Sequence, residues 1–197
     1  MDSLKYNFVE EHLSKKSNKW LVKVPDEFFI DQFNLIGIHD ILGTRSLEKA
    51  LSLIVNDYDN IDIKDFTSIS KNAVFLYGLA HARYITTPEG LNSVKKKFIN
   101  NEFGNCLKIS CFKQSMLPIG IYDKPSHEKV KSFCPKCQDI YHPELDSDSE
   151  DDENETNSDD SSEDSFYMIE EDFCDGAFFG TGFPEFFFFH YPYLRPK

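Results

Sequence analysis

Two pairs of cysteines carry the clearest chemical signal in this chain of 197 residues. Cys106 and Cys111 are separated by four residues and Cys134 and Cys137 by two, with 22 residues between the pairs. Short loops of this kind each present two sulfurs to one tetrahedral ion, so the spacing predicts a closed zinc site with four thiolate ligands. Such a site leaves no position for water or substrate. We therefore expect one structural zinc ion per chain and no catalytic metal.

Other roles for these cysteines fit the sequence less well. Disulfides would require an oxidising compartment, and the N-terminal residues lack the apolar core of a signal peptide. A redox role for Cys134 and Cys137 would require a βαβ context, whereas an acidic run follows them closely. His127 and His142 are alternative ligands, but four well-spaced thiolates leave them spare. Cys174 has no partner at metal-ligand spacing, and we expect it to be an unreactive thiol.

The elements that position the cysteines are predicted to form a small zinc ribbon over residues 104–143. Alternating apolar residues indicate two strand-like arms, with Leu107 and Ile109 in the first and Ile140 in the second. A module of this size cannot bury all three side chains internally, so they are candidates for a dimer interface. The alternative is that they pack on the rest of the chain.

Residues 18–103 are predicted to form an α-helical domain that follows a polar segment, residues 1–17. Four helices are expected there. The first has Phe29, Phe33 and Ile36 on its buried face, and the second begins near an N-cap at Ser46. The third has a buried stripe of Ile69, Ala73, Leu76, Ala80 and Tyr84, and the fourth begins at Thr87 and Pro88 with Leu91, Val94 and Phe98 facing inward. For His81 and Arg83 we expect a packing or capping role, and for Lys95–Lys97 a solvated helix face.

The remaining residues divide into an acidic segment, residues 144–172, and a Gly-rich aromatic segment, residues 173–197. The second is expected to pack on the ribbon or the helical domain, with a strand over Phe186–Tyr193. The fold class is therefore α+β: a mainly α-helical N-terminal domain, a small four-cysteine zinc ribbon and a disordered acidic insertion. No apolar run approaches the roughly 20 residues that span a membrane, and we expect a protein of the cytoplasm and nucleus.

The acidic segment contains fifteen Asp or Glu and no Lys or Arg, so removing its charge from the net −13 leaves about +2 for the rest. It has too few apolar residues to form a core, and we expect disorder. Four hydroxyl residues have an acidic residue three positions later and are candidate phosphoacceptors: Ser147, Ser149, Thr156 and Ser161. A passive solubilising loop is the alternative, because such spacing arises by chance in a segment this acidic.

These features together resemble the regulatory beta subunit of casein kinase II. The resemblance runs through the following stretches: Asp31-Gln-Phe-Asn-Leu-Ile-Gly37, Leu76-Tyr-Gly-Leu-Ala-His-Ala-Arg-Tyr84, Met116-Leu-Pro-Ile-Gly120, Lys131-Ser-Phe-Cys-Pro-Lys-Cys137, Gly180-Thr-Gly-Phe-Pro184 and Arg195-Pro-Lys197. It implies a helical domain followed by a zinc ribbon that dimerises, with the dimer binding two catalytic alpha subunits and selecting protein substrates.

The sequence departs from that family pattern in several places. The N-terminal serines followed by acidic residues are absent, the acidic stretch after the second helix is diluted, and the insertion at 144–172 is long. The family continues beyond the position of Lys197 into an aromatic tail that binds the catalytic subunit, so we expect weaker binding. Phe186–Phe189, Tyr191 and Tyr193 are candidate substitute anchors, but the matching segment of the family is mostly packed inside, and we favour that packing role here.

We interpret the chain as a non-catalytic regulatory and scaffolding subunit, because it has no phosphate-binding Gly-rich loop and no kinase catalytic motif. The alternative is a zinc-ribbon protein that binds nucleic acid or acts in transcription. Nucleic-acid affinity depends on neutralised phosphates, and a nearly neutral body beside an acidic segment disfavours it.

Overall fold

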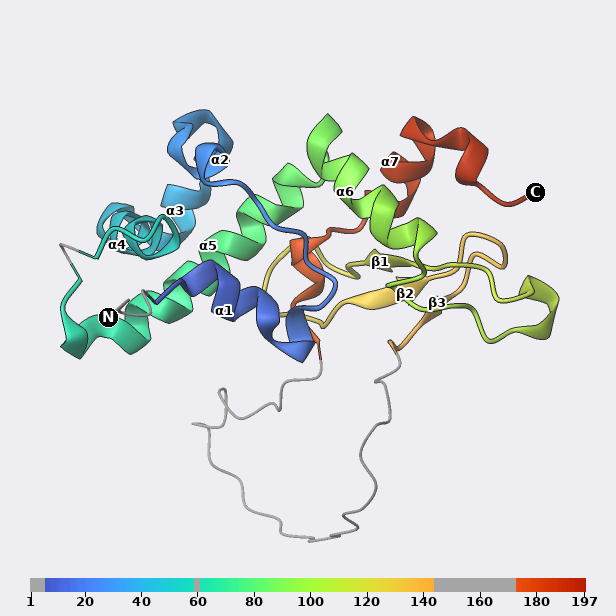
Figure 1. Cartoon of the computed structure of the whole chain (residues 1–197), viewed down its shortest axis with the longest axis horizontal. Helices are drawn as coiled ribbons and strands as arrows, with labels where there is room; N and C mark the ends of the chain where they lie inside the picture. Colours follow the sequence, from blue (N-terminus) through green and yellow to red (C-terminus); the bar gives the residue numbers. More distant parts are fainter. Residues whose placement is uncertain (1–5, 59–60, 144–172) are drawn as a thin grey trace, which may run out of the picture.

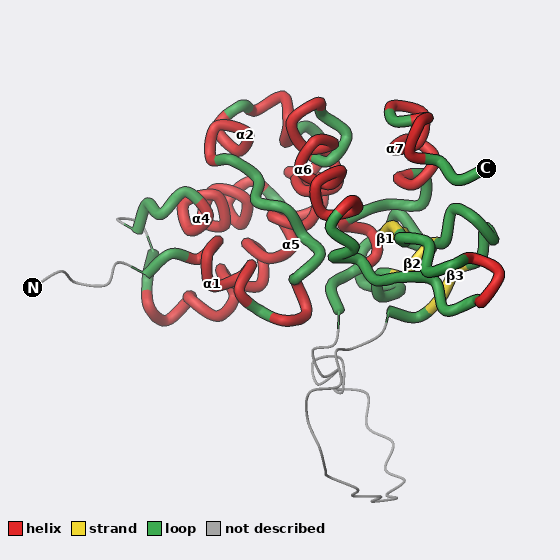
Figure 2. The backbone as a smooth tube through the Cα atoms, turned by 45° about the vertical axis from the view of Figure 1, so that its right-hand side comes forward, coloured by secondary structure: helices red, strands yellow, loops and turns green. Residues whose placement is uncertain are grey.

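The computed structural model describes residues 6–58, 61–143 and 173–197. Most helices fill one side of the molecule, and a three-stranded sheet with long loops lies at the other side (Figures 1 and 2). The helices and strands have the following bounds: α1 Phe8–Ser14, α2 Asp26–Ile30, α3 Ile38–Leu42, α4 Thr44–Ile54, α5 Phe66–Tyr84, α6 Pro88–Ile99, β1 Leu117–Ile119, β2 Lys131–Phe133, β3 Ile140–Tyr141 and α7 Phe183–His190.

Helix α5 is the centre of the helical part and packs along α4. The positions that the 3.6-residue period predicted to be buried are buried, and that prediction is confirmed: Ile69, Ala73, Leu76, Ala80 and Tyr84. The predicted start of α6 is also confirmed. The Thr87 hydroxyl accepts the Gly90 N–H at 3.2 Å, and Pro88 occupies the first turn, where no N–H is needed.

An extended segment, Trp20–Val24, crosses α5 without pairing in a sheet. Side chains of α5 satisfy its buried backbone instead: the Tyr77 hydroxyl accepts the Val24 N–H at 3.0 Å and donates to the Val22 carbonyl at 3.1 Å. The Val22 N–H donates to His81 Nε2 at 3.1 Å, and His81 Nδ1–H donates to the Phe178 carbonyl at 2.8 Å. The packing role expected for His81 is confirmed.

Two details of the predicted helices are wrong. The first helix ends at Ile30, because the Asp31 carboxylate accepts the Phe33 N–H at 3.0 Å and starts a separate 3-10 turn. This change of register leaves Phe33 81% and Ile36 58% exposed, although both were expected on a buried face. Ser46 does not cap the second helix, since α4 begins two residues earlier, at Thr44.

Arg83 has the packing role that was expected of it. Its guanidinium donates to the carbonyls of Asn34 and Ile36 at 2.6 and 2.8 Å, and thereby ties the turn after α2 to the end of α5.

The sheet is antiparallel in the order β1-β2-β3, with Phe133 opposite Leu117 on one side and Ile140 on the other. The predicted ribbon is present, but its first arm is not a strand. Ile109–Cys111 forms a 3-10 turn, closed by the Cys111 N–H on the Lys108 carbonyl at 2.8 Å. Leu107 and Ile109 therefore project from a loop.

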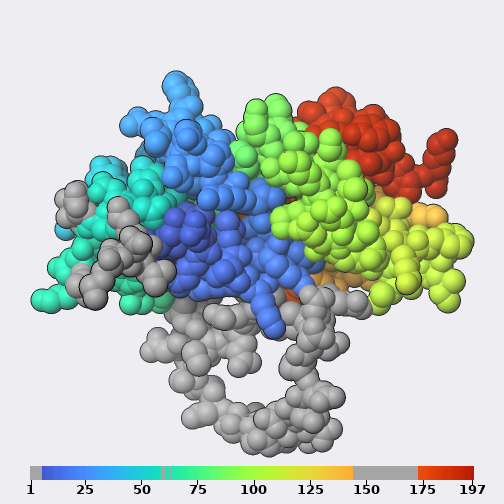
Figure 3. All heavy atoms as spheres, in the orientation of Figure 1, coloured from blue at the N-terminus to red at the C-terminus, as the bar shows by residue number. Residues whose placement is uncertain are grey.

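The C-terminal segment forms a helix, so the expected strand over Phe186–Tyr193 is wrong. Helix α7 contacts β1, and the rings of Phe187 and Phe98 lie 5.4 Å apart between α7 and α6. Figure 3 shows this segment, in red, against the green surface of α6. Leu117 and Val130 of the ribbon belong to the same core as the helices, so the base of the ribbon is continuous with them.

Within the described residues, no helix is both long enough and apolar enough to cross a membrane. The acidic segment predicted to be disordered, residues 144–172, lies outside the described residues.

Candidate metal centre

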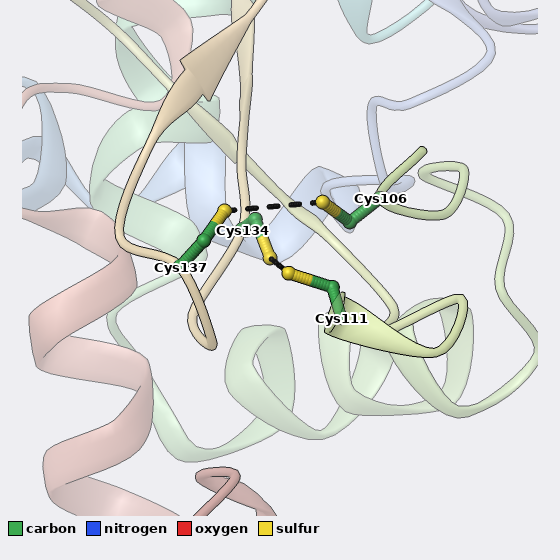
Figure 4. A group of neighbouring side chains, drawn as sticks. All are labelled: Cys106, Cys111, Cys134 and Cys137. Atoms are coloured by element: carbon green, nitrogen blue, oxygen red, sulfur yellow. Dashed lines mark hydrogen bonds between the residues drawn. The ribbon is translucent and has the colours of Figure 1, made fainter. Parts of the chain in front are cut away.

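Four cysteine sulfurs converge in the ribbon, in a small buried cluster separate from the main hydrophobic core. Cys106 and Cys111 come from the loop after α6, and Cys134 and Cys137 from the turn between β2 and β3. All four Sγ atoms lie within 4.8 Å of one another, and the four side chains point toward a common centre (Figure 4). The sulfurs of Cys106 and Cys137 are 3.9 Å apart, as are those of Cys111 and Cys134.

These distances fit a tetrahedral metal site. A Zn–S bond of about 2.3 Å places neighbouring sulfurs of a regular tetrahedron about 3.8 Å apart. A disulfide would require about 2.0 Å, and all four cysteines are free. His127 and His142 are not part of the cluster: His127 Nδ1 lies 3.1 Å from the Pro125 carbonyl, and His142 Nδ1 lies 3.1 Å from Lys131 Nζ.

Tight backbone turns aim the sulfurs inward. The Gln138 N–H donates to the Cys134 carbonyl at 2.8 Å, and the Cys134 N–H donates to the Asp139 carbonyl at 3.0 Å. The backbone is left-handed directly after each cysteine pair, at Phe112 with φ 53° and at Gln138 with φ 59°. Non-glycine residues rarely adopt this conformation, so the surrounding structure must hold them there. A metal bound by all four sulfurs would supply that restraint.

The two cysteines of the second pair differ in acidity. Burial raises the pKa of the Cys134 thiol to about 12. Burial also acts to raise the pKa of Cys137, but hydrogen bonds, first from the Tyr141 hydroxyl at 3.3 Å, outweigh it and lower the pKa to about 7. Cys137 is thus the more acidic thiol of this pair, and a cation bound beside Cys134 would favour its thiolate form.

Several residues around the centre were not expected from the sequence. The Tyr141 hydroxyl contacts Cys137, Lys108 forms a salt bridge to Asp139 across the two loops, and the Lys136 ammonium lies 4.6 Å from the centre of the Phe112 ring. Tyr141 lies only four residues after Cys137, whereas the other two contacts join loops more than 20 residues apart, and none of the three belongs to a short motif.

The three candidate interface residues lie on the surface of the ribbon. Leu107 is 73% exposed, Ile109 93% and Ile140 46%, and Phe112 joins them at 80%. We call these four residues the ribbon apolar surface. Sequence analysis missed Phe112, although its place directly after Cys111 on a projecting loop was a usable signal.

Other residues singled out in the sequence have ordinary surroundings or lie outside the described residues. Cys174 is buried, its backbone bridges Ser17 and Val130, and burial raises the pKa of its thiol to about 12, as an unreactive cysteine requires. Lys96 is exposed, whereas Lys97 donates to the Lys19 carbonyl at 2.8 Å and pairs with Glu102. The candidate phosphoacceptors Ser147, Ser149, Thr156 and Ser161 fall in the segment that is not described.

Comparison with known proteins identifies the family. The profile of the family described as casein kinase II regulatory subunit matches residues 7–156. The chain belongs to the casein kinase II regulatory subunit family. Casein kinase II subunit beta' of Drosophila melanogaster is 31% identical over 196 residues, which is 100% of this chain and 79% of that protein.

Two fungal relatives extend the comparison. Casein kinase II subunit beta of Schizosaccharomyces pombe is 33% identical over 96% of this chain and 72% of its own length. Casein kinase II subunit beta-2 of Neurospora crassa is 32% identical over 93% of this chain, which spans 56% of that relative. The match to the casein kinase II regulatory subunit family thus includes the helical part and all four clustered cysteines.

Proposed function

We propose that this chain is a non-catalytic regulatory and scaffolding subunit, which a structural zinc ion stabilises, which dimerises through its ribbon, and which binds casein kinase II catalytic subunits. Family membership supports the regulatory role. Zinc binding and dimerisation are supported by one observation: the cluster of four cysteine sulfurs lies directly beside the ribbon apolar surface. A metal that fixes the two loops also fixes the surface that they display.

Zinc is the proposed metal because four thiolates in a tetrahedron suit its coordination chemistry. Four protein ligands leave no open position, so the ion's role is structural. Metal binding at such sites contributes on the order of 10 to 16 kcal/mol to folding in zinc-finger peptides. Elemental analysis of the reduced chain should give one zinc per chain. Metal-free protein that keeps the ribbon folded would contradict the proposal.

Dimerisation is proposed to run through the ribbon apolar surface. Ile109 and Ile140 are too exposed to contribute to the monomer's core, so charged replacements should leave the fold intact while disrupting a dimer. Sedimentation should show an Ile109→Glu, Ile140→Glu double variant as a monomer. Phe33→Glu is the matched control, since Phe33 is 81% exposed on the helical side and should leave the dimer unchanged. An unaltered dimer in the double variant would refute the assignment.

The proposed partners are the casein kinase II catalytic alpha subunit and the protein substrates that the holoenzyme selects. Co-purification from the native cell is the direct test, because it reports a bound kinase or its absence. Ser147, Ser149, Thr156 and Ser161 are proposed phosphoacceptors, which mass spectrometry after incubation with the kinase and ATP would detect. Each phosphate adds about −1.5 to −2 charges.

Nucleic-acid and membrane binding are not part of the proposal. Outside residues 144–172 the chain carries a net charge of only about +2, which gives weak attraction to phosphates. Nucleic acid recovered instead of a kinase would favour the transcription-associated alternative. We propose the cytoplasm and nucleus as locations, which fluorescence microscopy of the tagged chain tests.

A further inference from the structure

The stretch that comprises α2, the 3-10 turn after it and α3 divides its large apolar side chains between two faces. Phe29 and Ile38 are almost fully buried in the helical core. Three others are exposed: Ile30 by 69%, Phe33 by 81% and Ile36 by 58%. We call these three residues the turn apolar surface. Single exposed apolar residues are ordinary, but three large ones within seven residues need an explanation.

Hydrogen bonds hold the backbone that presents this surface. The Asn34 side-chain amide donates to the Phe28 carbonyl at 3.0 Å, which folds the turn back onto α2. The Arg83 guanidinium donates to the carbonyls of Asn34 and Ile36, which ties the same turn to the end of α5. Phe33 and Ile36 lie three residues apart in a 3-10 turn, where side chains at that spacing eclipse one another. A surface that is already held in place loses less entropy when a partner binds.

The turn apolar surface is separate from the ribbon apolar surface. Both ribbon views place α2 at the edge of the helical part, away from the three strands (Figures 1 and 2). In Figure 3 the blue atoms of this part of the chain project from the body of the molecule. A partner of this surface is therefore distinct from the dimer contact proposed for the ribbon.

Acidic side chains accompany the exposed apolar residues. Residues 26–41 contain no Lys or Arg, and four carboxylates there are exposed: Asp26, Glu27, Asp31 and Asp40. Arg83 is the cation that contacts the turn, and two backbone carbonyls already engage its guanidinium. With histidine counted as neutral, the four carboxylates and Arg83 give a net charge of −3. The surface thus combines apolar side chains with negative charge.

This combination selects among possible occupants. An anionic membrane would be repelled by the carboxylates. A second copy that docked the same surface by two-fold symmetry would set carboxylates against carboxylates. A helix with one apolar face flanked by Lys and Arg meets both requirements, because its apolar face covers the exposed side chains while its cations approach the carboxylates.

We propose that the turn apolar surface and its carboxylates form a docking site for a basic amphipathic helix of a partner protein. Phe33 is the central anchor, because its ring is the largest and most exposed of the three side chains. Ile30 and Ile36 extend the apolar contact, and Glu27 and its acidic neighbours attract the cations of the helix. The docking site requires neither zinc nor the catalytic subunit, so it stands apart from the function proposed above.

The test measures peptide binding to the full chain, reduced and zinc-loaded, by fluorescence anisotropy at physiological ionic strength. The probe is a labelled peptide of about 14 residues, roughly four helical turns, with leucines at helical spacing and lysines elsewhere. We expect saturable one-to-one binding. A peptide of the same composition with scrambled leucines should bind at least about tenfold more weakly, as should one with glutamate in place of lysine.

The scrambled peptide is the decisive control. It carries the same positive charge as the probe, so residues 144–172 with their fifteen Asp or Glu would attract both peptides alike. Only a site that contacts the apolar face of the helix distinguishes the two sequences.

Variants with matched controls locate the site. Phe33→Ala should weaken binding of the probe about tenfold or more. Ile36→Ala should weaken it about threefold or more, whereas Ile99→Ala, which removes a 56% exposed side chain at the end of α6, should have no effect. Glu27→Gln should weaken it about two- to fivefold, and Glu10→Gln on α1 should not. Urea denaturation should show the parent's stability in every variant, because all five side chains are exposed.

Any of four results overturns the proposal. Unchanged binding by Phe33→Ala places the peptide elsewhere on the chain. Equal binding of the probe and the scrambled peptide assigns the capture to charge alone. A parent oligomer that Phe33→Ala dissociates in sedimentation identifies a second copy as the occupant. Co-sedimentation of the parent chain, but not of Phe33→Ala, with phosphatidylserine vesicles identifies a membrane.

Discussion

Tyr77→Phe removes one oxygen atom that two buried hydrogen bonds share. The lost hydroxyl accepts the Val24 N–H and donates to the Val22 carbonyl, and the Tyr77 side chain is fully buried. Phenylalanine keeps the ring and its packing but leaves two buried backbone groups without partners. Each unpaired group costs about 1 to 3 kcal/mol, and removal of the hydroxyl's own desolvation offsets part of the total. We expect a loss of about 2 to 4 kcal/mol.

Urea denaturation measures this loss directly. A thermal melt gives a second measure. For a chain of 197 residues, 1 kcal/mol of lost stability lowers Tm by roughly 2 to 4 °C, so Tm should fall by about 4 to 16 °C. Tyr193→Phe is the matched control, since Tyr193 is 72% exposed and should change stability little. Amide hydrogen exchange gives a local readout, because the Val24 N–H should lose protection. A variant that matches the control in stability, with Val24 still protected, would show that the hydroxyl does not hold the extended segment.

Three further predictions follow from named contacts. Burial lowers the pKa of His81 to about 4, which is below its value near 6.5 in the unfolded chain. The unfolded state therefore binds more protons as the pH falls. The free energy of unfolding should decrease by about 2 kcal/mol per such histidine between pH 7.5 and pH 5. Urea denaturation at both pH values should show a smaller fall for His81→Gln and an unchanged fall for His190→Gln; equal falls would contradict the assignment. Gly78→Ala would place a Cβ 2.1 Å from the Phe178 ring, and we expect about 1 to 3 kcal/mol of destabilisation by calorimetry, against little change for Gly182→Ala, which has open space. Cys134→Ser should abolish zinc binding by elemental analysis and unfold the ribbon end, whereas Cys174→Ser should retain one zinc per chain; zinc retained in Cys134→Ser would rule out that ligand.

The regular helices were predictable because their chemistry is local. Helix α5 has a buried stripe at helical spacing, and Thr87 and Pro88 define the start of α6 within a few residues of sequence. The cysteine cluster was predictable for the same kind of reason, since each pair lies in one short loop. Its surroundings were not, because the salt bridge from Lys108 to Asp139 depends on how the two loops meet, and the contact of Tyr141 with Cys137 depends on how the chain turns into β3.

The errors have physical causes as well. Phe186–Phe189 is an unbroken apolar run, which has no period that distinguishes a helix from a buried strand. Packing against both α6 and β1 made it a helix. At Phe33 a side-chain cap from Asp31 outweighed the hydrophobic pattern and turned the ring to solvent.

Native mass spectrometry of the reduced chain, alone and with the casein kinase II catalytic subunit, tests the central claim most directly. We predict a dimer that carries two zinc ions and that binds catalytic subunits without losing metal. The Ile109→Glu, Ile140→Glu variant should keep its zinc but appear as a monomer. A metal-free monomer of the parent chain that forms no complex with the catalytic subunit would contradict the account.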